Sequence, residues 1–290
     1  MPSLTPEQLE ERRTFIGASD ISAIVGVNPF KDAFDVLNEK LGFSAEAPEE
    51  ENEATDWGHR LEPVIRAWYV ATTDSKVQPC GTVRHPEHTW AAATLDSKIV
   101  GTRRGLEIKA VGHRMVYDWD TSDDEGIPHY VRCQTAWQMW CVGLEEIDVA
   151  SLLGGTIARV WRIKRDQELE RILVQQGRVF WEEHVVKRVA PTLTASDGAR
   201  AYLDAIFPPQ PMPVPADADE KIVEIVQRRA SAHTLRKMNE DRFTIATAEA
   251  IAWLGEHGAT DVKTEFFDFR YRLRKDGTRQ PYCKMKGDKL

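Results

Sequence analysis

The sequence predicts an α/β fold, in the broad sense that includes α+β, with a helical hairpin appended at its C-terminal end. Helical and strand-like segments alternate over the first two thirds of the chain, an order typical of a sheet covered by helices. Five prolines between residues 208 and 215 interrupt this pattern, and two helical stretches follow them. Prolines at this density favour an extended linker. The chain is therefore expected to divide into an α/β core and a C-terminal appendage.

Composition is that of an ordinary soluble globular protein. The 290 residues are 42% hydrophobic and 29% charged, enough for one large domain or two small ones. No stretch approaches the apolar length of a membrane helix, and the first residues lack the basic-then-apolar order of a signal peptide. We expect a cytoplasmic protein that does not engage a membrane.

Charge is spread unevenly along the chain. The net charge of −8 argues against a protein that coats nucleic acid through bulk positive charge. Residues 46–56 carry six acids and no base, whereas residues 270–290 carry eight bases and two acids. An acidic enzyme can still hold DNA where positive charge is local to a groove or tail, so composition neither requires nor excludes a DNA enzyme.

The N-terminal part is predicted to contain two short helices. The first, Asp20–Val25, would be capped by the hydroxyl of Ser19 and stopped by Gly26. The second, Ala33–Leu41, should end at Gly42 for the same reason, because glycine readily adopts the left-handed conformation that ends a helix.

A longer helix is predicted from Trp57 to Tyr69, after a solvated acidic loop. Its apolar residues recur at i, i+3, i+4, i+7 and i+8 counted from Leu61, which gives one apolar face. Beyond it we expect three strands, a helix, a pair of strands joined near two glycines, and a long helix. In order, these elements are Gly81–Arg84, Trp90–Asp96, Leu106–Ala110, Tyr130–Val142, Ile147–Leu153, Ile157–Ile163 and Asp166–Arg188.

The domain boundaries follow from the prolines. Residues 1–207 are predicted to form the core and residues 208–218 the linker. Residues 219–290 would form the appendage, whose two helices span about 219–238 and 241–256. A strand, Glu265–Leu273, and a basic tail complete it.

The residues that indicate chemistry are Asp96 and, after ten intervening residues, the segment Leu106-Glu107-Ile108-Lys109. In a strand, Glu107 and Lys109 point to one face and the apolar residues to the other. If Asp96 ends the neighbouring strand, both carboxylates converge on one spot. Mg²⁺ prefers such a site, made of one or two carboxylates, waters and phosphate oxygens.

A Glu-x-Lys pair alone is weak evidence, because strands often carry such pairs on a solvated face. Two helices add context. The first carries Glu62 beside its apolar stripe, and the second carries Gln134 and Gln138 one turn apart. The order Glu, Asp, Glu-x-Lys, Gln is what makes the set unusual.

That order resembles the lambda-exonuclease-like (YqaJ-type) viral recombinase nucleases. The resemblance runs from about residue 12 to residue 155. It begins with RRTFIGASDISAIVGVNPFKDAFDVLNEKLG, which is similar to the N-terminal signature of the family. The pieces GHRLEP, TLD, LEIK and QTAWQMWCVG follow in the family order. Two departures are that Leu95 replaces a proline before Asp96, and that Tyr130 lies four rather than three residues before Gln134.

The resemblance implies a PD-(D/E)XK, restriction-endonuclease-like core, with a central mixed sheet flanked by helices. It also implies an exonuclease that uses Mg²⁺, or Mn²⁺ in its place, to degrade one strand of duplex DNA from its 5′ end. The positions that match the catalytic residues of the family are Glu62, Asp96, Glu107, Lys109 and Gln134, of which Asp96, Glu107 and Glu62 would hold the metal.

Three further residues match the DNA contacts of the family. Arg12 and Ser19 correspond to the pair that holds the terminal 5′-phosphate, and a helix N-terminus at Ser19 would favour an anion. The residues alone favour a simpler interpretation, in which Ser19 is only a helix cap and Arg12 a surface charge. Arg114 is expected to contact a DNA phosphate, although its spacing from the Glu-x-Lys motif is off by one residue.

Cysteine usage argues against a second cofactor. Some nucleases of this superfamily hold an iron–sulfur cluster with a close-set C-terminal trio of cysteines. Here the cysteines are scattered, and none has the spacing of a CxxC pair or a zinc finger. We expect no iron–sulfur cluster and ordinary reduced thiols at Cys80, Cys133, Cys141 and Cys283.

By analogy with the family, the partners would be double-stranded DNA ends and a single-strand annealing protein. The protein would be encoded by a phage or prophage, act in the bacterial cytoplasm and form a ring-shaped trimer. Two alternatives stay open. One is an endonuclease of the same superfamily in repair or restriction, and the other is a non-catalytic DNA-binding subunit of the same fold.

Overall fold

The computed structural model describes residues 6–43, 53–120, 122, 126–208, 219–265, 267–273 and 278–285. Contacts divide the chain into two units, residues 1–209 and 210–290. Most of the acidic and proline-rich segments noted in the sequence lie outside the described residues.

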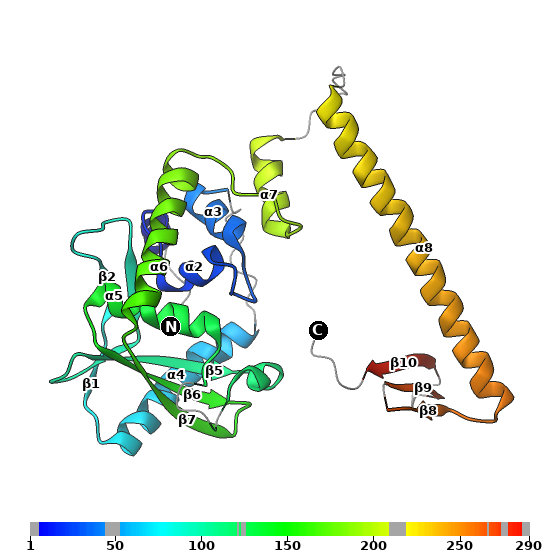
Figure 1. Cartoon of the computed structure of the whole chain (residues 1–290). Coiled ribbons are helices and arrows are strands. Elements are labelled where there is room, and N and C mark those ends of the chain that lie inside the picture. Colours follow the sequence, from blue (N-terminus) through cyan, green and yellow to red (C-terminus); the bar gives the residue numbers. More distant parts are fainter. Residues whose placement is uncertain are drawn as a thin grey trace. The chain divides into compact units, whose positions relative to one another are not determined.

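The first unit is built on a mixed five-stranded sheet in the order β1-β4-β5-β6-β7 (Figure 1). β5 and β6 are parallel, and the other neighbours are antiparallel. This is the central mixed sheet flanked by helices that the sequence predicted. The strands are β1 (Val77–Gln78), β4 (Ser97–Ile99), β5 (Arg104–Val111), β6 (Glu146–Leu153) and β7 (Ile157–Lys164).

Helices cover both faces of this sheet. α4 (Glu53–Thr73) packs Ile65 and Tyr69 against Leu106 and Ile108 of β5. On the opposite face, α5 (His129–Val142) lies over β6 (Figure 1). Because neighbouring residues of a strand alternate between faces, Glu107 and Lys109 point toward α5.

A separate hairpin leads into the sheet. Its strands are β2 (Gly81–Arg84) and β3 (Ala92–Leu95), which pair antiparallel. One residue after β3 the chain enters β4, so Asp96 occupies the junction between the two sheets.

Two further helices of this unit, α2 (Ala18–Ile24) and α6 (Gln167–Val179), pack against α5. α3 (Ala33–Leu41) packs against α2, and α7 (Asp197–Ile206) packs against α3. α1 (Pro6–Arg12) precedes them in the chain. The predicted long helix after residue 166 is divided, because α6 continues as the π-helical segment Phe180–Val186. α7 was not predicted.

The prediction for the start of α2 was wrong in one respect. Gly17 and not Ser19 is the N-terminal cap, because the carboxylate of Asp20 accepts the Gly17 N–H at 2.9 Å. Ser19 consequently lies in the first turn of the helix. Both stops are confirmed, since Gly26 and Gly42 have φ of 76° and 72°.

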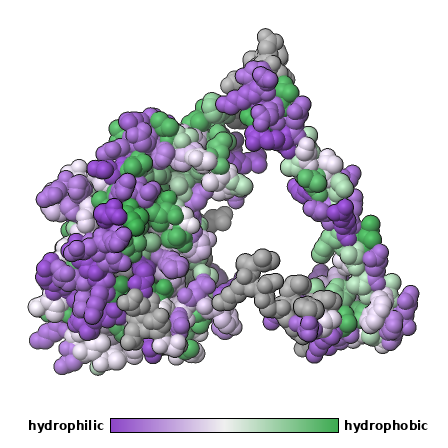
Figure 2. Space-filling model, in the orientation of Figure 1, coloured by the Kyte–Doolittle hydropathy of each residue, from purple (hydrophilic) through white to green (hydrophobic). Residues whose placement is uncertain are grey.

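The second unit corrects the predicted helical hairpin. A single 37-residue helix, α8 (Glu220–Glu256), replaces the two helices. The supposed break near residue 239 contains polar residues but neither glycine nor proline, so nothing there interrupts helical hydrogen bonding. Figure 2 shows apolar residues exposed at intervals along α8, and Leu254 is its single buried residue among those described.

An antiparallel three-stranded sheet follows α8. Its order is β10-β9-β8, with β8 at Asp261–Lys263, β9 at Phe267–Leu273 and β10 at Arg279–Met285. The predicted strand is present, and part of the predicted basic tail forms β10. None of the described helices is both long and apolar enough to cross a membrane.

Candidate active site

Two carboxylates meet at the junction of the hairpin and the central sheet. Asp96 accepts the backbone N–H of Ile108 through Oδ2 at 2.7 Å. That hydrogen bond fixes Asp96 beside Glu107, the residue before Ile108 on β5. Only 5% of Glu107 is exposed, and Asp96 is partly buried.

Glu107 is held by donors from α5 and β5. Its Oε1 accepts from Gln134 Nε2 at 2.7 Å and pairs with Lys109 Nζ at 2.8 Å. Lys109 Nζ also donates to Gln134 Oε1 at 2.9 Å. The three side chains thus form a closed ring of charge-assisted hydrogen bonds, which are stronger than neutral ones.

Glu62 lies at the edge of this group. It projects from α4 and pairs with Arg66 one turn further along the same helix. Arg66 also approaches the backbone carbonyl of Asp96, at 3.5 Å. The negative charge of Glu62 still reaches Asp96 and contributes to the shift of its pKa.

Electrostatics set the charge states of two site residues. Burial raises the pKa of Asp96 to about 8, and the charges of Glu107 and Glu62 add to the effect. Burial disfavours the charged form of Lys109, but the charge and hydrogen bond of Glu107 outweigh it and raise the pKa of that amine. Lys109 is therefore a protonated donor near neutral pH and not a free base.

The donor set fits a hard divalent cation. In the described ranges, no three His, Cys, Asp or Glu side chains gather closely enough to form a metal site by themselves. Asp96 and Glu107 supply two carboxylates, while Arg66 engages Glu62. Mg²⁺ takes one or two carboxylates and completes its shell with water and phosphate oxygens. Such a cation would also offset the like charges that raise the pKa of Asp96.

This arrangement predicts a pH-dependent effect of metal on thermal stability. The pKa of Asp96 is about 8 in the folded protein, against an ordinary value of 3.8. The folded state therefore binds this proton more tightly, and Asp96 destabilises the fold as pH rises from 4 through 8. A cation that binds the ionised pair should raise the melting temperature more at pH 9 than at pH 6. Scanning fluorimetry with Mg²⁺ or EDTA at both pH values measures this, and equal shifts at the two would contradict it.

Two of the three predicted phosphate residues, Arg12 and Ser19, lie on the N-terminal helices α1 and α2. Arg12 pairs with Glu39 at 3.4 Å and keeps a half-exposed side chain. Ser19 is exposed in the first turn of α2. Arg114 is exposed in the short 3₁₀ helix His113–Asp118 and makes no ion pair with the described residues. The structure thus brings Asp96, Glu107, Lys109 and Gln134 together. It does not bring Arg12, Ser19 or Arg114 into contact with that group.

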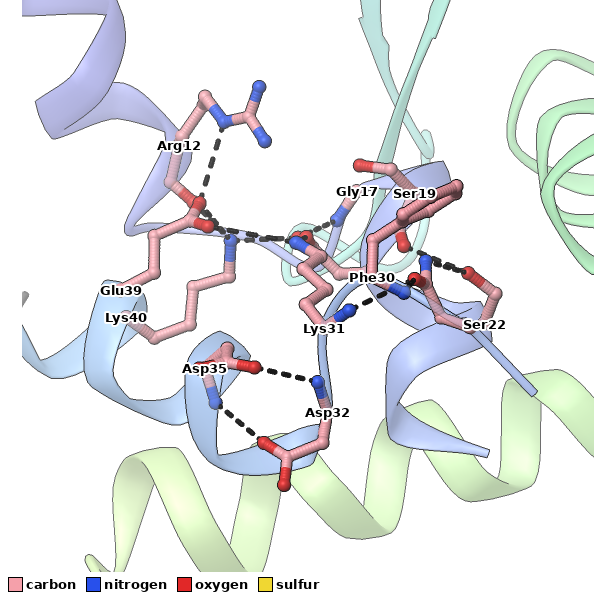
Figure 3. Close-up of polar contacts among 12 residues, drawn as sticks. Arg12, Gly17, Ser19, Ser22, Phe30, Lys31, Asp32, Asp35, Glu39 and Lys40 are labelled. Atoms are coloured by element: carbon pink, nitrogen blue, oxygen red, sulfur yellow. Dashed lines mark hydrogen bonds and ion pairs between the residues drawn. The ribbon is translucent and has the colours of Figure 1, made fainter. Parts of the chain in front are cut away.

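A buried charge cluster separates Arg12 from Ser19. Lys40 and Lys31 pair with the two oxygens of Asp20, at 2.8 and 2.5 Å. Burial opposes the ionisation of Asp20, yet these lysines and Arg12 hold its pKa well below the usual range. Figure 3 shows Arg12 and Ser19 on opposite sides of Lys31 and Lys40. Positive charge therefore gathers at the start of α2.

Sequence reasoning left two contacts of the site unassigned. Gln138 donates to Glu107, and Arg66 pairs with Glu62. Each lies one helical turn beyond a predicted site residue, Gln134 and Glu62 respectively. That spacing, which places side chains on the same helix face, is the signal that could have identified them.

Comparison with known proteins identifies the family and the fold that the core resembles. Residues 7–145 match the model of the YqaJ-like viral recombinase domain. The chain is 33% identical over 201 residues to the uncharacterized protein YqaJ of Bacillus subtilis (strain 168), a match that covers 68% of this chain and 61% of YqaJ.

Two crystal structures share the fold. They are those of the alkaline exonuclease LHK-Exo from Laribacter hongkongensis and of LHK-Exo in complex with dAMP. Each is 23% identical, with TM-scores of 0.51 and 0.52, and the match covers 62% of this chain and 93% of the other. The core has the fold of the lambda-exonuclease-like nucleases. The match to the YqaJ-like viral recombinase domain over residues 7–145 confirms the resemblance found in the sequence.

Proposed function

We propose that this protein is a metal-dependent exonuclease that degrades linear double-stranded DNA. The observation that carries the proposal is the cluster of Asp96, Glu107, Lys109 and Gln134 under α5. Two carboxylates can hold a divalent cation for phosphodiester hydrolysis, a protonated amine can offset charge on the phosphate, and an amide can hold these groups in place. The family of the domain supports the same activity.

In this proposal the side chains of the chain divide the work. A bound Mg²⁺, or Mn²⁺ in its place, would polarise the scissile phosphate and lower the pKa of the attacking water. Asp96 and Glu107 hold that cation, with Glu62 as a nearby third carboxylate. Lys109 donates to the phosphate or to the attacking water and offsets negative charge as it develops. Gln134 orients both Lys109 and Glu107.

We assign the polarity 5′→3′, with Arg12, Ser19 and Arg114 as phosphate contacts. Arg12 uses one nitrogen for Glu39, and Lys31 and Lys40 add positive charge beside it. This positive charge would attract an anion, such as a phosphate, near the start of α2. Degradation from the 5′ end leaves a 3′ single strand, the substrate of a single-strand annealing protein in phage-type recombination.

The same proposal covers assembly and location. A net charge of −8 does not favour tight electrostatic binding to DNA. Such binding alone would therefore not keep the protein on one strand through repeated cycles. Closure of a ring around DNA would provide the tether, and cyclic assemblies are common among homo-oligomers. We therefore propose a trimer, acting in the cytoplasm of a bacterial host. Light scattering of the purified protein tests this, and a strict monomer with and without DNA rules out the ring.

Labelled DNA tests the activity itself. Linear duplex should be degraded with Mg²⁺ while covalently closed circles stay intact, and label at the 5′ end should be released before label at the 3′ end. Cleavage of circles at the same rate would instead indicate an endonuclease.

The proposed contact of Arg12 with the 5′-phosphate predicts how the rate of digestion depends on that phosphate. Removing the 5′-phosphate from the substrate should slow digestion by the wild-type protein. Arg12→Ala should slow digestion of phosphorylated ends to the rate of hydroxyl ends, because it removes a guanidinium that binds the phosphate. Arg178→Ala, an exposed arginine on α6, serves as the control. An Arg12→Ala protein that still prefers phosphorylated ends would show that the phosphate binds elsewhere.

A further inference from the structure

Gln138 contacts β3, the strand that leads into Asp96, and the Glu107 side chain of β5. It lies on α5 and is fully buried. Its Nε2 donates to Glu107 Oε2 at 2.7 Å and to the backbone carbonyl of Thr94 at 2.9 Å. Thr94 precedes Asp96 by two residues, so one amide links the segment of Asp96 to the side chain of Glu107.

The orientation of this amide is unambiguous. Both of its partners are acceptors, so the NH₂ group must face them and the carbonyl oxygen must face away. That oxygen, Oε1, is buried and has no hydrogen-bond partner. A buried acceptor without a partner is destabilising. An apolar side chain of similar length would avoid this penalty but would leave Glu107 Oε2 and the Thr94 carbonyl without this donor, so the glutamine is tied to these two acceptors.

The second bond changes what Glu107 can do. Gln134 and Lys109 both act on Oε1. With these contacts alone, the carboxylate could still turn about its last side-chain torsion, which has broad minima. The bond from Gln138 to Oε2 removes that freedom. Both oxygens then hold fixed directions relative to Asp96.

We propose that Gln138 is a positioning residue that fixes the plane of the Glu107 carboxylate for binding a divalent cation. This proposal rests on the metal-dependent activity proposed above. Gln138 does not touch the substrate. It acts through Glu107, in the way that the hydrogen-bonding partners of metal ligands set ligand direction in other metal sites.

Calorimetric titration of Mn²⁺ into the protein without DNA tests this role. Gln138→Met keeps the length of the side chain and removes both hydrogen bonds. It should weaken Mn²⁺ binding by about 10–100-fold, while the metal-free protein still unfolds cooperatively. Met139→Leu is the matched control, because Met139 is equally buried on α5 but packs in the apolar core. It should bind Mn²⁺ as the wild type does.

The outcomes separate the two proposals. Wild-type protein that binds no Mn²⁺ overturns the proposed activity and the role of Gln138 with it. Wild type and Gln138→Met with equal affinities overturn the positioning role alone. If Gln138→Met does not fold, Gln138→Asn, whose shorter amide cannot span both partners, is read in the same way. Loss of folding in both variants would make Gln138 a structural residue and end the proposal.

Discussion

Replacing Asp96 by asparagine should lower the rate of duplex degradation by roughly 10³-fold or more, because a bound metal contributes several kcal/mol of transition-state stabilisation. Asparagine can still accept the Ile108 N–H. It also resembles the protonated carboxyl that the raised pKa of Asp96 favours at neutral pH. The variant should therefore fold and bind DNA normally while its catalysis fails.

Nucleotide release from labelled linear duplex, together with DNA binding in EDTA, measures the effect of Asp96→Asn. Asp56→Asn is the control, since Asp56 is an exposed residue of α4 that pairs with Arg60. A rate for Asp96→Asn within tenfold of the wild type would remove Asp96 from the site.

Lys109→Met should lower the rate by about 10²–10⁴-fold, the usual contribution of a positioned proton donor. The change removes the amine that contacts both Glu107 and Gln134. It also removes a positive charge that lowers the pKa of Asp96. Any remaining activity should therefore require a higher pH than in the wild type.

A pH–rate profile distinguishes this from simple damage to the site. Lys109→Arg keeps the charge, so its profile should stay close to that of the wild type even where its rate is low. Lys98→Met, on the exposed face of β4, should change neither rate nor profile. A Lys109→Met enzyme with wild-type rate would show that the amine takes no part in the reaction.

The sequence could predict those site residues whose orientation depends on the local periodicity of a strand or helix. Alternation along β5 sends Leu106 to the core and Glu107 to the site, because side chains of a strand alternate between its faces. Helical spacing likewise places Gln134 on the inner face of α5. These relations hold over a few residues, so the pattern of apolar and polar residues determines them.

Other contacts depend on competition or on distance in the sequence. Ser19 and Gly17 can both cap α2, and the Asp20 carboxylate decides between them by binding the Gly17 N–H. The link from Gln138 to Thr94 spans 44 residues and follows from the packing of α5 against the hairpin. No local pattern encodes such a contact. The continuous helix α8 shows the converse error, in which a polar stretch was interpreted as a turn without a helix-breaking residue.

The central claim about the proposed site is that DNA degradation depends on a divalent cation. Purified wild-type protein should convert linear duplex DNA to acid-soluble nucleotides with Mg²⁺ or Mn²⁺ at pH 8–9, and should release none in EDTA. Asp96→Asn, purified in parallel, excludes a contaminating nuclease. Degradation that continues in EDTA, or none with either metal across this pH range, would contradict the assignment of Asp96, Glu107 and Lys109 as a metal-dependent nuclease site.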